Sequence, residues 1–120
     1  MNIQWITIHV NNMDESKAFY ENFLGLKQIR TFSPSDKMTI AFYTADNGMK
    51  IELIENKTVS HNRVDNSGIS IGIAFENYKD ILKEAREKQM IAIEPQILGN
   101  DMECFFITDP NGIGIQIIKA

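Results

Sequence analysis

Residues 42–52 read FYTADNGMKIE and residues 106–116 read FITDPNGIGIQ, so two closely similar stretches lie 64 residues apart. Each stretch starts with an aromatic residue, passes through an Asn-Gly pair and ends with an apolar residue followed by a polar one. Similarity at one fixed separation is typical of a duplicated supersecondary unit. The repeat makes Glu52 and Gln116 equivalent positions, one acidic and one neutral.

Each half of the chain predicts the same order of elements, namely a strand, a helix and three further strands. In the first half, Asn12 is expected to cap the helix and Gly25 to end it. A turn is expected at 33–36, and the Asn-Gly pair predicts a hairpin at 46–48. The strands of this half are predicted at 3–10, 27–33, 37–44 and 49–55.

The second half repeats the pattern, with a helix expected from an Asn77 cap through Ala85. Pro95 should lie at a bulge or on an edge strand, because proline cannot donate a hydrogen bond to a sheet ladder. The strands of this half are predicted at 68–75, 91–96, 102–108 and 113–119.

The predicted fold class is therefore α+β, with two βαβββ modules at 1–56 and 68–120 joined by a polar linker at 57–67. All 120 residues are expected to form one domain. A curved sheet with one helix on its back leaves its other face open. Two such faces would form a cup, with the helices on the outer side, and a cup is a suitable ligand pocket.

Composition narrows the function classes. The net charge is −4 and the basic residues are scattered, so nucleic acid is not an expected partner. No apolar run approaches the length of a membrane span, and no signal peptide is visible. Cys104 is the single cysteine, which is compatible with a reducing compartment, and a cytoplasmic location is expected.

Two motifs carry a family resemblance. The first is Val10-x-Asn12-x3-Ser16-x2-Phe19-Tyr20-x3-Leu24-Gly25, and the second is Asp109-Pro-Asn-Gly112 before the last strand. With the duplication, they resemble the vicinal oxygen chelate superfamily, which includes glyoxalase I, extradiol dioxygenases, and fosfomycin and bleomycin resistance proteins. The resemblance implies the two-module fold and says less about activity, since one fold hosts many functions.

The resemblance also implies where a metal would bind. Metal-using members carry His or Gln, Glu, His and Glu at four positions, which fall here on Trp5, Glu52, Ser70 and Gln116. Only Glu52 is retained. An indole cannot ligate a metal, a serine hydroxyl is a poor ligand and an amide is a weak one. We therefore expect no metal at this site and no cofactor.

The candidate ligand-binding residues are those expected on the open faces. Trp5, Thr7 and His9 share one face of the first strand. Trp5 could stack on a ligand or fill the space left by the metal, and His9 could act as a base or bind a backbone carbonyl. Glu52 could bind a cation, act as a base or pair with Gln116. The full set is Trp5, Thr7, His9, Glu52, Ser70 and Gln116, with Glu52 and His9 as the catalytic candidates.

Other reactive residues have plainer interpretations. His61 is expected to be an exposed loop residue, and Cys104 a buried, inert thiol. No Ser–His–Asp, zinc-spacing or phosphate-loop motif occurs. The leading hypothesis is a metal-independent protein that binds a small organic molecule, as the bleomycin resistance proteins do. The alternative is a glyoxalase-like lyase or isomerase, or a dioxygenase, with a nonstandard site around His9, Glu52 and Gln116 that works with or without a metal. A homodimer is expected in either case.

Overall fold

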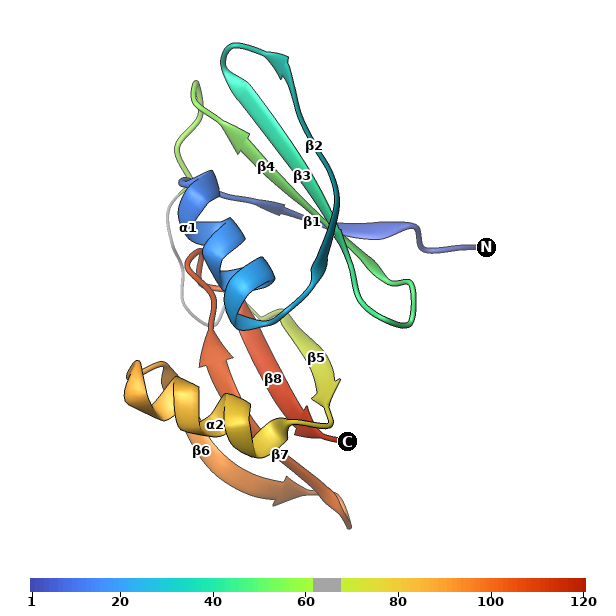
Figure 1. The fold of residues 1–120 in the computed structure, drawn as a ribbon, viewed down its shortest axis with the longest axis vertical. Helices are drawn as coiled ribbons and strands as arrows, with labels where there is room; N and C mark the ends of the chain where they lie inside the picture. Colours follow the sequence, from blue (N-terminus) through green and yellow to red (C-terminus); the bar gives the residue numbers. More distant parts are fainter. Residues whose placement is uncertain (62–67) are drawn as a thin grey trace. The chain divides into compact units, whose positions relative to one another are not determined.

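The computed structural model describes residues 1–61 and 68–120 and divides into two compact units, Met1–Asn62 and Arg63–Ala120 (Figure 1). Each unit contains one helical segment and one four-stranded sheet. The elements of the first unit are β1 (Trp5–His9), α1 (Met13–Lys17), the π-helix η1 (Ala18–Phe23), β2 (Lys27–Ser35), β3 (Met38–Thr44) and β4 (Lys50–Asn56). Those of the second are β5 (Ser70–Phe75), α2 (Tyr78–Glu87), β6 (Ile91–Leu98), β7 (Met102–Thr108) and β8 (Gly114–Lys119).

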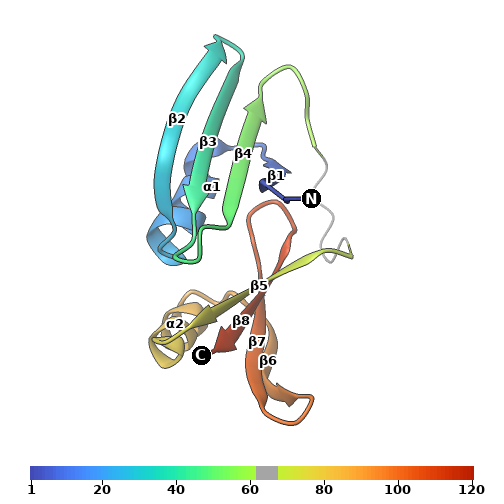
Figure 2. The same cartoon turned by 90° about the vertical axis from the view of Figure 1, so that its right-hand side faces the viewer.

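The two sheets have the same topology. The strand orders are β1-β4-β3-β2 and β5-β8-β7-β6. In each sheet the first and last strands of the unit pair in parallel, and the other pairs are antiparallel, as Figure 2 shows for β2, β3 and β4. This arrangement confirms the α+β class and the two βαβββ modules.

The repeat extends to the hydrogen bonds of the turn before each last strand. Ala45 N donates to Met49 O at 2.9 Å, and Asp109 N donates to Ile113 O at 2.8 Å. Gly48 and Gly112 end these turns with φ values of +88° and +93°, a region that glycine enters without steric cost. The Asn-Gly hairpin predicted at 46–48 is therefore confirmed.

The first helical segment begins as predicted. The Oδ1 atom of Asn12 accepts a hydrogen bond from Glu15 N at 2.9 Å, and Gly25 follows the helix with φ +82°. In the second unit Asn77 is the N-cap of α2, as predicted, although its side chain makes no capping hydrogen bond. Its backbone instead serves the helix, since Asn77 O accepts from Asp80 N and Ile81 N.

Proline explains the main error in the predicted boundaries. The turn expected at 33–36 is shorter, because β2 continues to Ser35 with a register shift between Phe32 and Ser35. Pro34 lies in this irregular stretch of an edge strand, where a missing N–H costs little. Pro95 has the equivalent place in β6, at a register shift between Ile93 and Gln96, as predicted.

One face of each sheet is covered by the helix of its own unit. In the first unit Ile8, Ala41 and Leu53 are buried on that face, against a helical segment that buries Phe19 and Phe23. In the second unit the buried side chains include Ile81, Ala85, Phe105, Ile107, Ile115 and Ile117. The opposite face of each sheet has no helix of its own unit on it (Figure 1). In the described part of the chain, no helix is long and apolar enough to cross a membrane.

Candidate functional site

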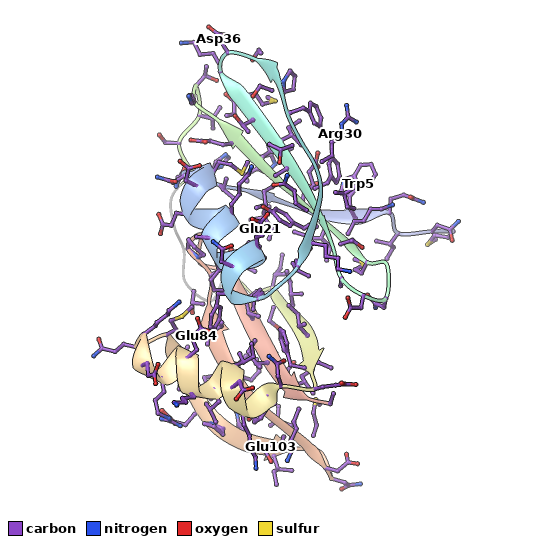
Figure 3. All side chains as sticks on the ribbon, viewed as in Figure 1. Trp5, Glu21, Arg30, Asp36, Glu84 and Glu103 are labelled. Carbon is purple, nitrogen blue, oxygen red and sulfur yellow. The ribbon has the colours of Figure 1, made fainter. Side chains whose placement is uncertain are left out.

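The open face of the first sheet carries a row of polar and aromatic side chains. Directly paired residues in a sheet point to the same face. Because Thr7 pairs with Glu52, Glu52 with Phe42, and Phe42 with Arg30, these four side chains share one face. Figure 3 shows Trp5 and Arg30 on the side of this sheet away from Glu21, which belongs to the helical segment.

Glu52 is held by its neighbour on the first strand. The hydroxyl of Thr7 donates to Glu52 Oε1 at 2.6 Å, which is a short, charge-assisted hydrogen bond. Ile51 and Leu53 on either side are buried toward the helix, whereas Glu52 is partly exposed. The carboxylate therefore points away from the core with its position fixed, and it retains acceptor capacity for a donor or a cation.

Trp5 supplies the largest aromatic surface on this face. Its ring meets that of Phe42 edge to face, with centroids 5.2 Å apart and planes at 83°. The Trp5 residue is 45% exposed, so much of the indole is free to contact a ligand. A partly exposed indole can stack on a planar or cationic group.

The two histidines lie together. The rings of His9 and His61 have centroids 5.1 Å apart, and the side chain of Asn11 makes hydrogen bonds to the backbone N and O of His61. His61 lies in a loop, as predicted, but it is partly buried rather than exposed, and the Asn11 side chain holds its backbone near the end of β1. Within the described residues, the His9 ring makes no hydrogen bond to a backbone carbonyl.

Gln116 has partners within its own sheet. Its Nε2 lies 3.4 Å from Cys104 Sγ and 3.8 Å from Met102 Sδ, both within hydrogen-bond distance for sulfur. Glu52 and Gln116 are therefore engaged by different neighbours, Thr7 in one unit and the two sulfurs in the other. Cys104 is fully buried, as predicted.

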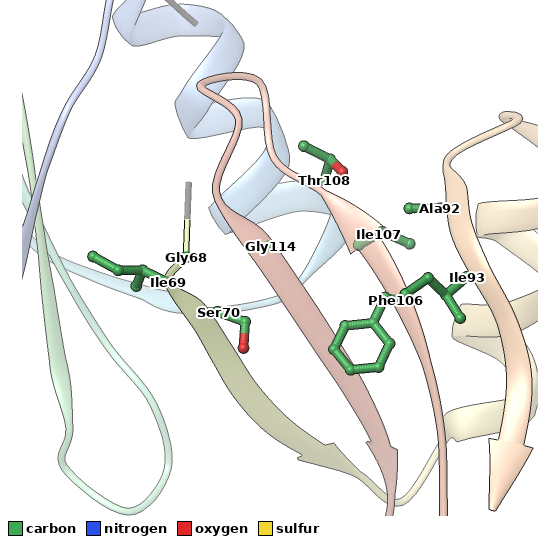
Figure 4. A pocket seen from close by; sticks show the side chains of 9 residues that line it. All are labelled: Gly68, Ile69, Ser70, Ala92, Ile93, Phe106, Ile107, Thr108 and Gly114. Atoms are coloured by element: carbon green, nitrogen blue, oxygen red, sulfur yellow. The ribbon is translucent and has the colours of Figure 1, made fainter. Parts of the chain in front are cut away.

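A hollow of about 460 Å³ lies on the open face of the second sheet (Figure 4). Of the six predicted ligand-binding residues only Ser70 lines it. Its wall is largely apolar, with the hydroxyls of Ser70 and Thr108 as polar groups. The lining residues are Gly68, Ile69, Ser70, Ala92, Ile93, Phe106, Ile107, Thr108 and Gly114.

Sequence reasoning missed most of this hollow. Ser70 pairs with Gly114, and Gly114 pairs with Thr108, so three small residues cross the sheet in one row. A Cβ atom on Gly114 would come within 3.3 Å of Ser70 Cβ, which shows how close the backbones approach there. The signal was present in the repeat, since the first unit has Trp5, Lys50 and Thr44 in the equivalent row.

Two buried tyrosines have raised pKa values. Burial, together with the charge and hydrogen bond of Glu21, raises the pKa of Tyr43 well above its ordinary value. Burial and the nearby charge of Glu103 raise the pKa of Tyr78. Both hydroxyls stay protonated at neutral pH, so neither tyrosine is a candidate base.

The residues at the family's metal positions do not fit a metal ion. In the first unit the pair is Trp5 and Glu52, and the indole has no lone pair to donate. In the second unit the pair is Ser70 and Gln116, and the Gln116 amide nitrogen is directed at sulfur atoms. Across residues 1–61 and 68–120, no group of three or more His, Cys, Asp or Glu residues is placed to hold a metal ion.

Comparison with known proteins connects this geometry to a family. The family model described as Glyoxalase/Bleomycin resistance protein/Dioxygenase superfamily matches residues 2–117. The lactoylglutathione lyase of Salmonella typhimurium is 27% identical over 119 residues, covering 94% of this chain and 88% of the lyase.

Solved structures agree on the fold. The trypanothione-dependent glyoxalase I of Leishmania major is 26% identical, with a TM-score of 0.77 over 99% of this chain and 86% of that one. A glyoxalase I mutant from Zea mays has a TM-score of 0.81 at 21% identity, over 96% of this chain and 43% of that one. A hypothetical protein from S. aureus has a TM-score of 0.70 at 24% identity, over 100% and 95%.

Proposed function

This chain belongs to the Glyoxalase/Bleomycin resistance protein/Dioxygenase superfamily, and we propose that it binds a small organic molecule on the open faces of its sheets, without a metal ion. The observation that carries the proposal is the hollow on the second sheet. Its volume of about 460 Å³ lies in the usual range for ligand pockets. An apolar wall with two hydroxyls resembles such pockets in chemistry as well.

The open face of the first sheet supports the same proposal. Trp5, Thr7, His9 and Glu52 place an indole, a hydroxyl, an imidazole and a carboxylate on one side of β1 and β4. Glu52 would favour a cationic or neutral ligand over an anion, because a fixed carboxylate repels negative charge.

Binding can be tested by screening small neutral and cationic aromatic compounds for an increase in thermal stability. Ser70→Trp should abolish the effect of compounds that occupy the hollow, because an indole fills it as Trp5 fills the equivalent row. Ser70→Ala is the matched control and should retain binding, with a loss of no more than about 1 kcal/mol for one hydroxyl. Equal binding by wild type and Ser70→Trp would refute the assignment of the hollow.

Metal independence has its own test. The protein purified without chelators should carry no stoichiometric divalent metal whose binding depends on Glu52, because one carboxylate is too few ligands. Elemental analysis of wild type and Glu52→Ala measures this directly. About one ion per chain, lost in Glu52→Ala, would contradict the proposal.

A second candidate function is a lyase or isomerase, favoured by the 27% identity to the Salmonella lactoylglutathione lyase over 94% of this chain. Glu52 and His9 would then be the acid–base groups, with Gln116 as a supporting polar group. A lactoylglutathione lyase assay decides between the candidates. Turnover that disappears in Glu52→Ala would establish the enzyme, and its absence with and without added Zn²⁺ or Ni²⁺ would leave ligand binding.

We further propose a cytoplasmic homodimer. The exposed apolar side chains Ile3, Ile6, Ile69 and Ile97 give a second copy surface to cover. The single cysteine is compatible with a reducing compartment. Light scattering at micromolar concentration should give twice the chain mass, and the protein should be recovered in the soluble fraction of its cell. A monomeric mass would contradict the dimer.

A further inference from the structure

The two histidines of the chain, His9 and His61, lie side by side although 51 residues separate them in sequence. His9 is the last residue of β1, and its side chain is exposed. His61 follows the last strand of the first unit, and the two ring centroids are 5.1 Å apart with planes tilted by 37°. Both residues belong to the first unit.

Two hydrogen bonds from one side chain hold His61 beside His9. Asn11, two residues after His9, accepts a hydrogen bond from His61 N at 2.9 Å through Oδ1, and its Nδ2 donates to His61 O. This double contact fixes the backbone from which the second imidazole extends. Within the described residues, neither imidazole makes a hydrogen bond through its ring nitrogens.

We propose that His9 and His61 together bind a divalent transition-metal ion, with Zn²⁺ as the representative, and that water completes its coordination. Imidazole binds Zn²⁺ with a nitrogen–metal distance of about 2.0–2.1 Å, so two imidazoles on one tetrahedral ion have centroids about 5 Å apart. The observed centroid separation of 5.1 Å agrees with this distance. Imidazole is also a good ligand for Ni²⁺ and Cu²⁺.

This site differs from the family's metal position. His9 pairs across the sheet with Ile54, whereas the retained family carboxylate pairs with Thr7. No third His, Cys, Asp or Glu in the described part of the chain is grouped with the two histidines. Two protein ligands give a site of modest affinity that exchanges its ion. The bound ion fastens His61 to the end of β1 and stabilises the folded first unit by mass action.

The test is a calorimetric titration of the chelator-treated protein with Zn²⁺, combined with thermal unfolding at each metal concentration. We expect about one ion per chain with a micromolar dissociation constant and a rise in Tm with Zn²⁺. Asn11→Ala keeps both histidines but removes the side chain that holds His61, so it should weaken binding about tenfold. His9→Ala and His61→Ala should each weaken it further.

Glu52→Gln is the control, and it should bind Zn²⁺ as wild type does. His61 lies outside every helix and strand, so His61→Ala tests the site without disturbing the sheet. Unchanged affinity in His61→Ala, or no saturable binding below about 1 mM, would overturn the inference alone. Binding that is lost in Glu52→Gln and kept in His61→Ala would place the ion at the family position and contradict the proposed function as well.

Discussion

The two open sheet faces have the same backbone plan and different chemistry. In the first, the central row is polar and charged, and in the second it is mainly apolar. The two faces already differ on the first strand of each unit. Thr7 donates a hydrogen bond to Glu52, whereas its counterpart Gly72 has no side chain to donate one to Gln116. The two rows are Thr7, Glu52, Phe42 and Arg30 in one unit, and Gly72, Gln116, Phe106 and Ile93 in the other.

The neighbouring row differs in size. Trp5 and Lys50 pair in the first unit, and Ser70 and Gly114 pair at the same place in the second. The second sheet therefore has a hollow where the first has a large aromatic ring. A duplicated backbone thus offers one face with a fixed carboxylate and an indole, and another with room for an apolar group. Changes that exchange these features test the comparison.

The turns before the last strand of each unit should differ most in their contribution to the free energy of unfolding. Asp109 is fully buried and accepts hydrogen bonds from Asn111 N at 2.8 Å and Ile113 N at 2.7 Å. The equivalent position in the first unit, 64 residues earlier, is Ala45, and the aspartate of that turn, Asp46, is exposed. Asp109→Ala should lower the free energy of unfolding by about 2–4 kcal/mol, because buried donors lose their acceptor. Asp46→Ala should change it by no more than about 0.5 kcal/mol. Urea denaturation measures both, and equal effects would mean that the turns are energetically alike.

The second largest effect on stability is expected when the carboxylate of Glu52 and the amide of Gln116 are exchanged. Gln116→Glu places a charge beside Cys104 Sγ with Gly72, not threonine, across the strand, so it should cost about 1–3 kcal/mol. The double change Gly72→Thr with Gln116→Glu should recover part of that loss, because it rebuilds the Thr7–Glu52 pair. Glu52→Gln should cost less than about 1 kcal/mol, since the hydrogen bond is exposed and an amide oxygen still accepts it. If the double variant is no more stable than Gln116→Glu, the threonine does not support the carboxylate.

Removing the hydroxyl of Tyr43 or of Tyr78 should change stability by a smaller amount. Tyr43 donates to Glu21 at 3.3 Å, whereas the buried Tyr78 hydroxyl makes no hydrogen bond to another described residue. Tyr43→Phe should therefore cost about 1 kcal/mol at neutral pH, and Tyr78→Phe should be neutral or stabilising. Chemical denaturation of the two variants at pH 7 checks this, with the reverse order as the contradicting result.

The same tyrosines predict an alkaline effect. Their folded pKa values are raised, so the unfolded chain releases these protons first. Their contribution to stability is complete below about pH 10 and is lost as pH rises above it. Wild-type stability should fall above about pH 10, and the fall should be shallower in each Phe variant. An unchanged slope in Tyr43→Phe would show that the folded environment does not hold this proton.

Much of the fold was predictable because the signals were local. The 64-residue repeat, the Asn12 cap, Gly25 and the Asn-Gly turn each fix a short segment, and the structure has them as expected. The misplaced turn at 33–36 arose because Pro34 looked like a turn signal. An edge strand can absorb a proline at a bulge, and the sequence alone does not show which strand lies at the edge.

The candidate site was less predictable because its shape depends on register. Parity placed Trp5, Thr7, His9 and Glu52 on one face, and the pairing of β1 with β4 agrees. The hollow depends instead on three small residues that come from three strands. The His9–His61 contact depends on Asn11 and a loop, and nothing in the spacing of two histidines so far apart indicates it.

The most direct test of the account is an amide NMR titration of chelator-treated protein with a compound from the aromatic screen. The account predicts saturable shifts at Ser70, Phe106 and Thr108 with no metal present, and their loss in Ser70→Trp. Binding that appears only after a divalent metal is added, or shifts confined to residues away from the open faces, would contradict it.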